Sequence, residues 1–369
     1  MNIADERRIK RGKIILLAFE NKRICDLGKI EELVERLASF GYYCDKISRV
    51  AFDSSEEITR AVEDGVDNYE NIIIYCPSSM GQTFRDFISR LLGADFDNLG
   101  VLSKDSVTVF LLWSDGGGKL AAEDVKAVLD KKYSLCYDRT VIRTVGAPVS
   151  ALDGALKAAR ACFVDGGAHI NVTDSFSDCR IEIVYSSQTP KMALDGAVRE
   201  IVKRLGEYIY ALEDVTLAEQ LYRLLKLRRM KIAVAESFTG GGVGKRLVEV
   251  SGISEVYYEG LNTYSNQSKT NRLGVKELTL NQQGAVSAET AYQMAEGLLR
   301  SEGCEVAIST TGIAGPKSDN TSKPVGLGYI GVGVDGDISV YKFNFTGDRE
   351  RITNTAVNQA LFLAYKRLK

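Results

Sequence analysis

Short apolar segments alternate with amphipathic segments between residues 13 and 144, and this alternation limits the folds open to the chain. It predicts strands and helices that follow one another singly, the order of a layered α/β domain with a largely parallel sheet. The expected strands are 14–18, 42–47, 71–76 and 107–113, and the expected helices are 29–39, 56–64, 84–92 and 121–129. Ligand sites of such sheets lie at the carboxyl ends of strands, which makes 77–83 and 114–118 candidate loops.

The length of 369 residues predicts further domains, because a single hydrophobic core stops growing at roughly 250–300 residues. Residues 145–212 read as a small α+β module, and residues 213–369 return to an α/β pattern. The expected helices are 150–162, 191–205, 217–229, 288–300 and 349–368, and the expected strands are 168–173, 180–186, 231–235, 258–263, 306–310, 327–334 and 338–345. We therefore predict an α/β fold in three domains, 1–144, 145–212 and 213–369.

The composition points to a small-molecule substrate. A net charge of -2 and a pI near 5.8 give no electrostatic reason to expect nucleic acid or an anionic membrane as partner. No run approaches the roughly 20 apolar residues that a membrane span requires, and the charged N-terminus has no signal-peptide core, so we expect a cytoplasmic protein. The seven cysteines form no C-x-x-C pair, which favours reduced thiols over disulfides or a zinc site.

The single histidine, His169, restricts the chemistry further. Any Ser-His-Asp or Cys-His mechanism would have to use this residue, and a centre with several histidine ligands is impossible. An isolated histidine on an expected strand reads as a structural residue. We therefore expect no metal or cofactor, and any hydrolytic base should be another residue type.

A hydroxyl-bearing, glycine-rich turn follows the apolar strand 231–235 and opens a helix, which makes it the best candidate for an active site. Its serine, Ser237, needs a base, and Lys269 can serve if burial lowers its pKa. Tyr264 could relay a proton or orient the amine, and the N–H groups of residues 239–242 could form an oxyanion hole. Two alternatives stay open: such a turn can be only a helix cap, and a lysine can simply lie on the surface.

Two other serines, Ser254 and Ser265, could take the proton-handling role instead. A third polar segment, 311–316, follows the expected strand 306–310 and could be a plain loop. Its occurrence in one domain with the turn and Lys269, each after an apolar strand, favours a shared site.

At these residues the chain resembles the CinA C-terminal domain family of nicotinamide-nucleotide amidases, which convert nicotinamide mononucleotide to nicotinate mononucleotide and ammonia. The matching pieces are Ala235-Glu236-Ser237-x-Thr239-Gly240-Gly241, Thr263-Tyr264-Ser265-Asn266-x-x-Lys269, Gly284-Ala285-Val286-Ser287, Thr311-Gly312-Ile313-Ala314-Gly315-Pro316, Lys323-Pro324-Val325-Gly326 and Gly347-Asp348-Arg349. The resemblance implies a metal-independent Ser237–Lys269 pair with Tyr264 alongside. It implies substrate contacts by Thr239, Gly240, Gly241, Asn266, Thr311, Gly312, Ala314 and Arg349, the last suited to a phosphate group.

Two positions depart from the family pattern. The family usually has cysteine at the position of Phe238, so a thiol nucleophile is excluded there. A second arginine common after the Gly-Asp-Arg piece is replaced by Thr353, although Arg351 is near, and phosphate affinity could be weaker.

Residues 1–144 resemble, more faintly, the molybdopterin-binding MoaB/MogA-like domain that begins full-length CinA proteins. Where those proteins have paired glycines this chain has Ser78 and Ser79, and Arg85 replaces an acidic residue. We expect this degenerate domain to have lost the pyrophosphatase activity of some relatives and to serve a structural role, as in a homodimer. Two alternatives remain: a CinA-like nucleotide-binding or regulatory scaffold without turnover, and ADP-ribose pyrophosphatase activity in the first domain.

Overall fold

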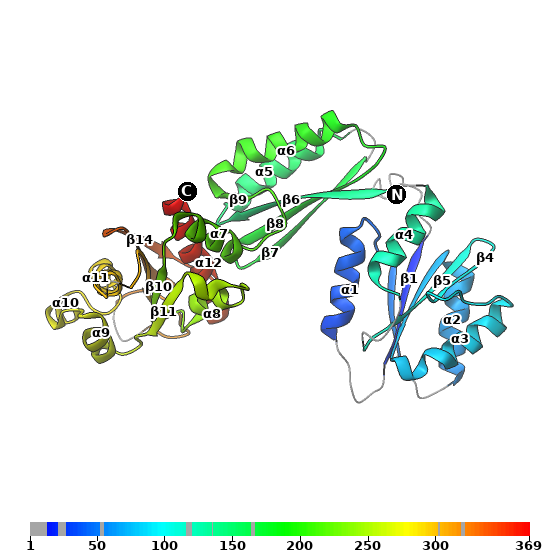
Figure 1. The fold of residues 1–369 in the computed structure, drawn as a ribbon, viewed down its shortest axis with the longest axis horizontal. Coiled ribbons are helices and arrows are strands. Elements are labelled where there is room, and N and C mark those ends of the chain that lie inside the picture. The colour runs from blue at the N-terminus through cyan, green and yellow to red at the C-terminus, as the bar shows by residue number, and fades with distance from the viewer. Residues whose placement is uncertain are drawn as a thin grey trace. The chain divides into compact units, whose positions relative to one another are not determined.

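The structure is a computed structural model that describes residues 13–20, 27–51, 55–115, 120–134, 136–163, 167–301, 303–318 and 322–369. The chain is mixed α/β with three sheets, as the sequence predicts (Figure 1). It divides into two compact units, Met1–Thr140 with Ala159–Asn171 and Glu182–Ala197, and the remainder, Val141–Ala158, Val172–Ile181 and Val198–Lys369. The domain boundaries at 144 and 212 stay predictions.

The first unit contains a five-stranded sheet in the order β2-β1-β3-β5-β4. The four strands β1 to β3 and β5 are parallel and the edge strand β4 is antiparallel, which confirms a largely parallel sheet. Helices α1 and α4 pack on one face, and α2 and α3 pack on the other. The elements are β1 (Ile14–Glu20), α1 (Leu27–Ser39), β2 (Lys46–Ala51), α2 (Ser55–Asn68), β3 (Asn71–Cys76), α3 (Ser78–Leu92), β4 (Val101–Lys104), β5 (Val107–Trp113) and α4 (Ala122–Tyr133).

Two expectations for this unit are wrong. The strand expected at 42–47 lies at Lys46–Ala51, because Tyr42 packs in the core at 1% exposure with its hydroxyl donating to Asp130 at 2.6 Å. The segment 77–83, expected to be a loop, is mostly helix, since α3 begins at Ser78 directly after β3. Ser78 and Ser79 do not have the backbone freedom of glycine, which would favour a loop here.

A second sheet has the order β7-β8-β6-β9, and its strands are shared between the two compact units. The predicted helices and strands of the α+β module are all present. They are β6 (Tyr137–Val145), α5 (Val149–Arg160), β7 (Ala168–Ser175), β8 (Asp178–Ser186), α6 (Lys191–Leu205), the 3-10 turn η2 (Gly206–Tyr208) and β9 (Ile209–Ala211). His169 lies on β7 with its ring centroid 5.8 Å from that of Tyr43.

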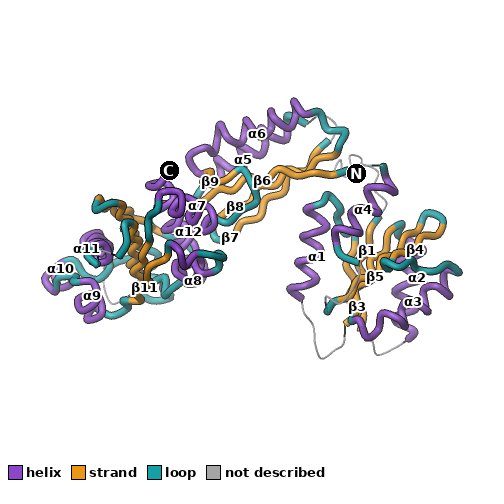
Figure 2. The backbone as a smooth tube through the Cα atoms, in the orientation of Figure 1, coloured by secondary structure: helices purple, strands orange, loops and turns teal. Residues whose placement is uncertain are grey.

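The third sheet has the order β11-β10-β12-β13-β14, with β10 parallel to both β11 and β12 and with β13 and β14 antiparallel. Helices α7, α8 and α12 contribute to the core on one face, and α9, α10 and α11 cover the other (Figure 2). The elements are α7 (Leu217–Arg228), β10 (Ile232–Glu236), α8 (Gly242–Val248), η3 (Ile253–Glu255), β11 (Tyr257–Asn262), α9 (Asn266–Leu273), α10 (Glu277–Gln282), α11 (Ala288–Leu299), β12 (Val306–Gly312), β13 (Leu327–Val334), β14 (Asp337–Asn344) and α12 (Arg349–Leu368).

Alternation along β10 explains this layering. Ile232, Val234 and Glu236 point to the α8 and α12 side, whereas Ala233 and Ala235 point to the α11 side. Within the described residues, none of the helices has the length and apolar character needed to cross a bilayer.

Candidate active site

The candidate site lies at the carboxyl ends of three neighbouring parallel strands, β10, β11 and β12. Ser237 follows β10 and its N–H donates to Thr310 O on β12 at 3.0 Å, while Thr263 after β11 donates from its N–H to Glu236 O at 2.9 Å. Each strand end is therefore tied to the next. The three polar segments that the sequence singles out converge at this edge of the sheet.

Lys269, on the first turns of α9, reaches the serine directly. Its Nζ lies 3.0 Å from Ser237 Oγ, 2.7 Å from Thr263 O and 3.2 Å from Tyr264 O. The side chain is 1% exposed, and this burial lowers the pKa of Lys269 to about 8. A neutral amine would give its two hydrogens to the two carbonyls and turn its lone pair to the serine hydroxyl.

Glu236 is a buried carboxylate that shapes the turn, and the sequence analysis missed it. One oxygen accepts from Thr239 Oγ1 at 2.7 Å and from the N–H groups of Gly241 and Val243 at 3.0 and 3.1 Å, and the other accepts from Gly244 N at 2.8 Å. The carboxylate thus fills the N-terminus of α8, where a ligand anion would otherwise bind. The available signal was an acidic residue at an inward position of an otherwise apolar strand.

The prediction that the N–H groups of residues 239–242 form an oxyanion hole is therefore wrong for three of these four groups. The N–H of Gly241 is taken by Glu236, and the N–H groups of Gly240 and Gly242 donate back to the carbonyls of Ser237 and Thr239 at 3.1 Å each. Across the described part of the chain, the N–H groups of residues 238 and 239 have no acceptor. These are the donors of the turn that remain for a ligand.

Tyr264 and Arg349 meet at the open side of the site. Tyr264 is 65% exposed, and its hydroxyl accepts from Arg349 Nη2 at 3.3 Å. Arg349 begins α12, and its Nη1 donates to Gly315 O at 2.5 Å. The tyrosine contacts Lys269 through its backbone carbonyl, so its hydroxyl is placed beside the arginine and not beside the amine.

The other residues predicted to bind substrate differ in their exposure and contacts. Thr311 is 1% exposed and donates from Oγ1 to Ala285 O at 2.7 Å. Gly312 has no room for a side chain, because a Cβ would lie 2.9 Å from Leu327 O. Ala314 is packed in the apolar core, and Asn266 is exposed at the start of α9. Their roles toward a substrate stay predictions.

The two alternative serines are placed differently from Ser237. Ser265 caps α9, since its Oγ accepts from Ser268 N at 3.1 Å. Ser254 is exposed on η3. Phe238 is 5% exposed and turns into the core, with its ring centroid 6.4 Å from that of Phe345.

A cavity of about 670 Å³ opens on the α11 face of the same sheet. Tyr329 lines it and is the register partner of Thr311 on β12. Gln283, Ser287 and Lys323 also line it, so the walls are polar. Its size is in the range of small-molecule sites.

The first unit has a different arrangement at its strand ends. Ser78 donates from its N–H to Asp115 Oδ2 at 3.1 Å, and its hydroxyl also bonds to that oxygen. Gly81 faces the Trp113 indole so closely that a Cβ would lie 2.7 Å from Nε1. Asp115 therefore takes the first N–H of α3, which a bound phosphate would need. The glycines at 116–118 lie outside the described residues.

Residues 214–368 match the family model of the CinA C-terminal domain. This part of the chain belongs to the CinA family. A relative from Halothermothrix orenii with the provisional name competence-damage inducible protein is 38% identical over 226 residues, 54% of this chain and 55% of that protein. One from Clostridium perfringens with the same name is 50% identical over 161 residues, 43% of this chain and 39% of that protein. The chain thus spans about half the length of the curated relatives it matches.

Among solved structures, a CinA superfamily protein from Klebsiella pneumoniae is 31% identical, with a TM-score of 0.40. The match covers 41% of this chain and 95% of that one. The CinA-type region contains β10 to β14, Ser237, Lys269 and Arg349.

Proposed function

We propose that the CinA-type domain hydrolyses the carboxamide of nicotinamide mononucleotide to the carboxylate and ammonia, without a metal. The observation that carries this proposal is the 3.0 Å contact between Lys269 Nζ and Ser237 Oγ, made by a buried amine whose pKa is lowered to about 8. A hydroxyl beside a base of this kind can act as a nucleophile on an amide.

The reaction proceeds in two steps. As Ser237 Oγ bonds to the carboxamide carbon, Lys269 takes the hydroxyl proton, and the carbonyl oxygen becomes an oxyanion. The N–H groups of residues 238 and 239 are the donors left to stabilise it, and one such donor is commonly worth about 3 kcal/mol. Collapse expels ammonia, which carries the proton from Lys269, and leaves an ester on Ser237.

Water then cleaves that ester. Lys269 takes a proton from the water as it attacks, and returns it to Ser237 Oγ as the acid leaves. The mechanism needs no second base, because the amine of Lys269 serves both steps in turn.

Arg349 supports the mononucleotide as substrate. Its guanidinium stands at the open side of the site beside the exposed Tyr264, and guanidinium groups bind phosphate through paired hydrogen bonds. Because Glu236 fills the N-terminus of α8, the phosphate should bind at Arg349 and not at that helix end.

The test is to incubate the full chain with nicotinamide mononucleotide and measure ammonia and the acid product. We expect equal amounts of both, and activity that persists after chelation of divalent metals. The absence of ammonia release would overturn the proposal, and loss of activity with chelator would overturn its metal independence. Ser265→Ala should keep the activity, because the Ser265 hydroxyl caps α9, whereas the Lys269 amine bonds to Ser237, Thr263 and Tyr264.

A further inference from the structure

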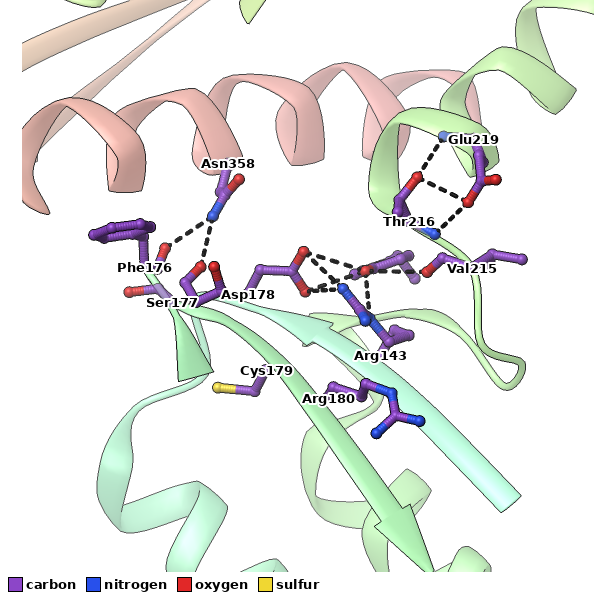
Figure 3. Close-up of polar contacts among 12 residues, drawn as sticks. Arg143, Phe176, Ser177, Asp178, Cys179, Arg180, Val215, Thr216, Glu219 and Asn358 are labelled. Atoms are coloured by element: carbon purple, nitrogen blue, oxygen red, sulfur yellow. Dashed lines mark hydrogen bonds and ion pairs between the residues drawn. The ribbon is translucent and has the colours of Figure 1, made fainter. Parts of the chain in front are cut away.

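One face of α12 carries polar side chains at intervals of seven residues, about two helical turns, and these side chains contact the β7–β8 hairpin and β9. The central one, Asn358, is 5% exposed. Its Nδ2 donates to Ser175 O at 2.9 Å and to Phe176 O at 3.0 Å (Figure 3). Both hydrogens of this buried amide are therefore used to hold the tip of the hairpin.

The two flanking members of the stripe make further contacts. Arg351 Nη2 lies 3.5 Å from Asp174 Oδ2, at the end of β7. Tyr365 donates from its hydroxyl to Tyr210 O on β9 at 3.0 Å. The opposite face of α12 is apolar and belongs to the core of the third sheet. The helix is thus fixed on two sides.

The hairpin tip is a stiff support. Phe176 and Ser177 have φ values of 55° and 68°, which cost non-glycine residues roughly 1 kcal/mol or more each. Ser177 donates from its N–H to Asp174 Oδ1 at 2.8 Å and accepts from Gly146 N at 2.9 Å. Two consecutive left-handed residues form the two-residue turn whose twist matches the flanking strands of a hairpin.

The first residue of β8, Asp178, which directly follows the tip, is held as firmly. Arg143 Nη2 lies 3.0 Å from Asp178 Oδ2 and its Nε donates to the hydroxyl of Tyr210 at 2.7 Å, while that hydroxyl lies 3.1 Å from Asp178 Oδ1 (Figure 3). The side chains of Arg143 and Asp178 are 14% and 13% exposed. The backbone carbonyl of Tyr210 also accepts the hydrogen bond from the Tyr365 hydroxyl, so this network continues into α12.

Arg349 is the first residue of α12, and an α-helix is stiff over the nine residues, about 13 Å, that separate it from Asn358. A shift or rotation of α12 would therefore move the guanidinium away from Tyr264 and Gly315. We propose that Asn358 is a positioning residue, which uses the β7–β8 hairpin to fix Arg349 for the phosphate group of the substrate. This inference rests on the proposed function.

The test compares binding of the mononucleotide with binding of its nucleoside, which lacks the phosphate, by titration calorimetry. Asn358→Ala should weaken binding of the mononucleotide about tenfold and leave binding of the nucleoside unchanged. The pH midpoint of turnover should not move, because Lys269 lies on α9. The matched control is Asn354→Ala on the same helix. The Nδ2 of Asn354 bonds to Glu350 O within α12, so this variant should bind both ligands as the unchanged protein does.

Two further variants distinguish the positioning role from a general loss of folding in Asn358→Ala. Tyr365→Phe removes one hydroxyl and should show the same phosphate-dependent loss at smaller size, about twofold to threefold. In an Arg349→Met background, Asn358→Ala should have no further effect on mononucleotide binding, as expected for two residues that act through one contact. Additive effects in that background would contradict the proposal.

Equal weakening of both ligands by Asn358→Ala would overturn the positioning role. Binding of the mononucleotide in preference to the nucleoside, without ammonia release, would overturn the proposed hydrolysis and leave the positioning role intact. A protein that binds neither ligand would overturn both.

Discussion

Two regions of the molecule place a serine hydroxyl at the carboxyl end of a parallel strand, and they differ in what the hydroxyl contacts. In the third sheet, Ser237 Oγ lies 3.0 Å from the amine of Lys269. In the first sheet, the hydroxyl and N–H of Ser78 both bond to the carboxylate of Asp115. One arrangement provides a base of pKa about 8, and the other is a carboxylate that caps α3.

If Ser237 is the nucleophile, position in the fold alone does not make a hydroxyl reactive. In the first sheet α3 begins at the serine itself, and in the third sheet α8 begins at Gly242. In both a carboxylate occupies the helix start, Glu236 in one and Asp115 in the other. The difference is the additional buried amine in the third sheet. A partner whose pKa is tuned by burial, supplied from a separate helix, distinguishes a candidate nucleophile from a capping residue.

The largest expected effect is on Ser237 itself. Ser237→Ala removes the proposed nucleophile and should lower kcat for ammonia release by roughly 10³-fold or more. The matched substitution in the other sheet, Ser78→Ala, should leave kcat unchanged. Steady-state ammonia assays on both variants test the contrast, and comparable losses in the two would contradict it.

The second effect concerns the pH dependence that Lys269 imposes. The neutral amine is the reactive form, so kcat/KM should rise about tenfold per pH unit below the pKa and level off above pH about 8. Lys269→Met should lower kcat by roughly 10²-fold to 10⁴-fold and abolish this rise. A profile that is flat between pH 6 and pH 9 in the unchanged protein would rule out Lys269 as the base.

The same pKa predicts a change of stability with pH. The unfolded lysine titrates near 10.5 and the folded one near 8, so the unfolded state binds more protons between these values. The free energy of unfolding should therefore gain a contribution as pH rises from 8 to 10.5. Lys269→Met should lack this gain and should be the more stable protein at pH 7, as denaturant titration at several pH values can measure.

A smaller effect is expected at Glu236. In Glu236→Gln an amide NH₂ would face either the N–H of Gly244 or the three donors at the other oxygen, so one donor would meet another. We expect the free energy of unfolding to fall by about 2 kcal/mol and kcat to fall roughly tenfold, because the turn that carries Ser237 is displaced. Glu249→Gln, an exposed change at the end of α8, is the control. An unchanged kcat would show that the turn keeps its shape without the charge.

The smallest effect is expected in the first sheet. Asp115→Ala removes the acceptor at the start of α3 and should destabilise the first unit by about 1 kcal/mol, while ammonia release stays the same. Thermal unfolding and the ammonia assay measure the two quantities separately. A change in kcat would mean that the two strand ends are functionally linked, which would break the comparison.

Much of the fold could be predicted because strand and helix periodicity is local. The parallel first sheet, the α+β module and the third sheet all follow from segments with clear patterns. Strand β2 could not be placed, because Tyr42 looks like a strand residue and is instead held in the core by its contact with Asp130. Helix α3 was expected to begin only at Phe84, because Ser78, Ser79 and Gly81 are weak helix formers, whereas it begins at Ser78.

The site was predictable in its residue types and not in its geometry. Ser237 and Lys269 could be paired by excluding histidine, but their 3.0 Å contact depends on how α9 packs on the sheet. The direction of the Tyr264 hydroxyl depends on Arg349, which is 85 residues away in the sequence. Glu236 could have been suspected, since an inward carboxylate on an apolar strand requires donors, and a glycine-rich turn supplies them.

Phe238 has a consequence for the durability of the site. Its phenyl ring is buried beside Phe345 and, unlike a thiolate, reacts with neither peroxide nor alkylating reagents. The reacting groups that remain are a hydroxyl and an amine, neither of which has a redox chemistry in the cell. The proposed hydrolysis should therefore continue through oxidative stress that would inactivate a cysteine-dependent amidase.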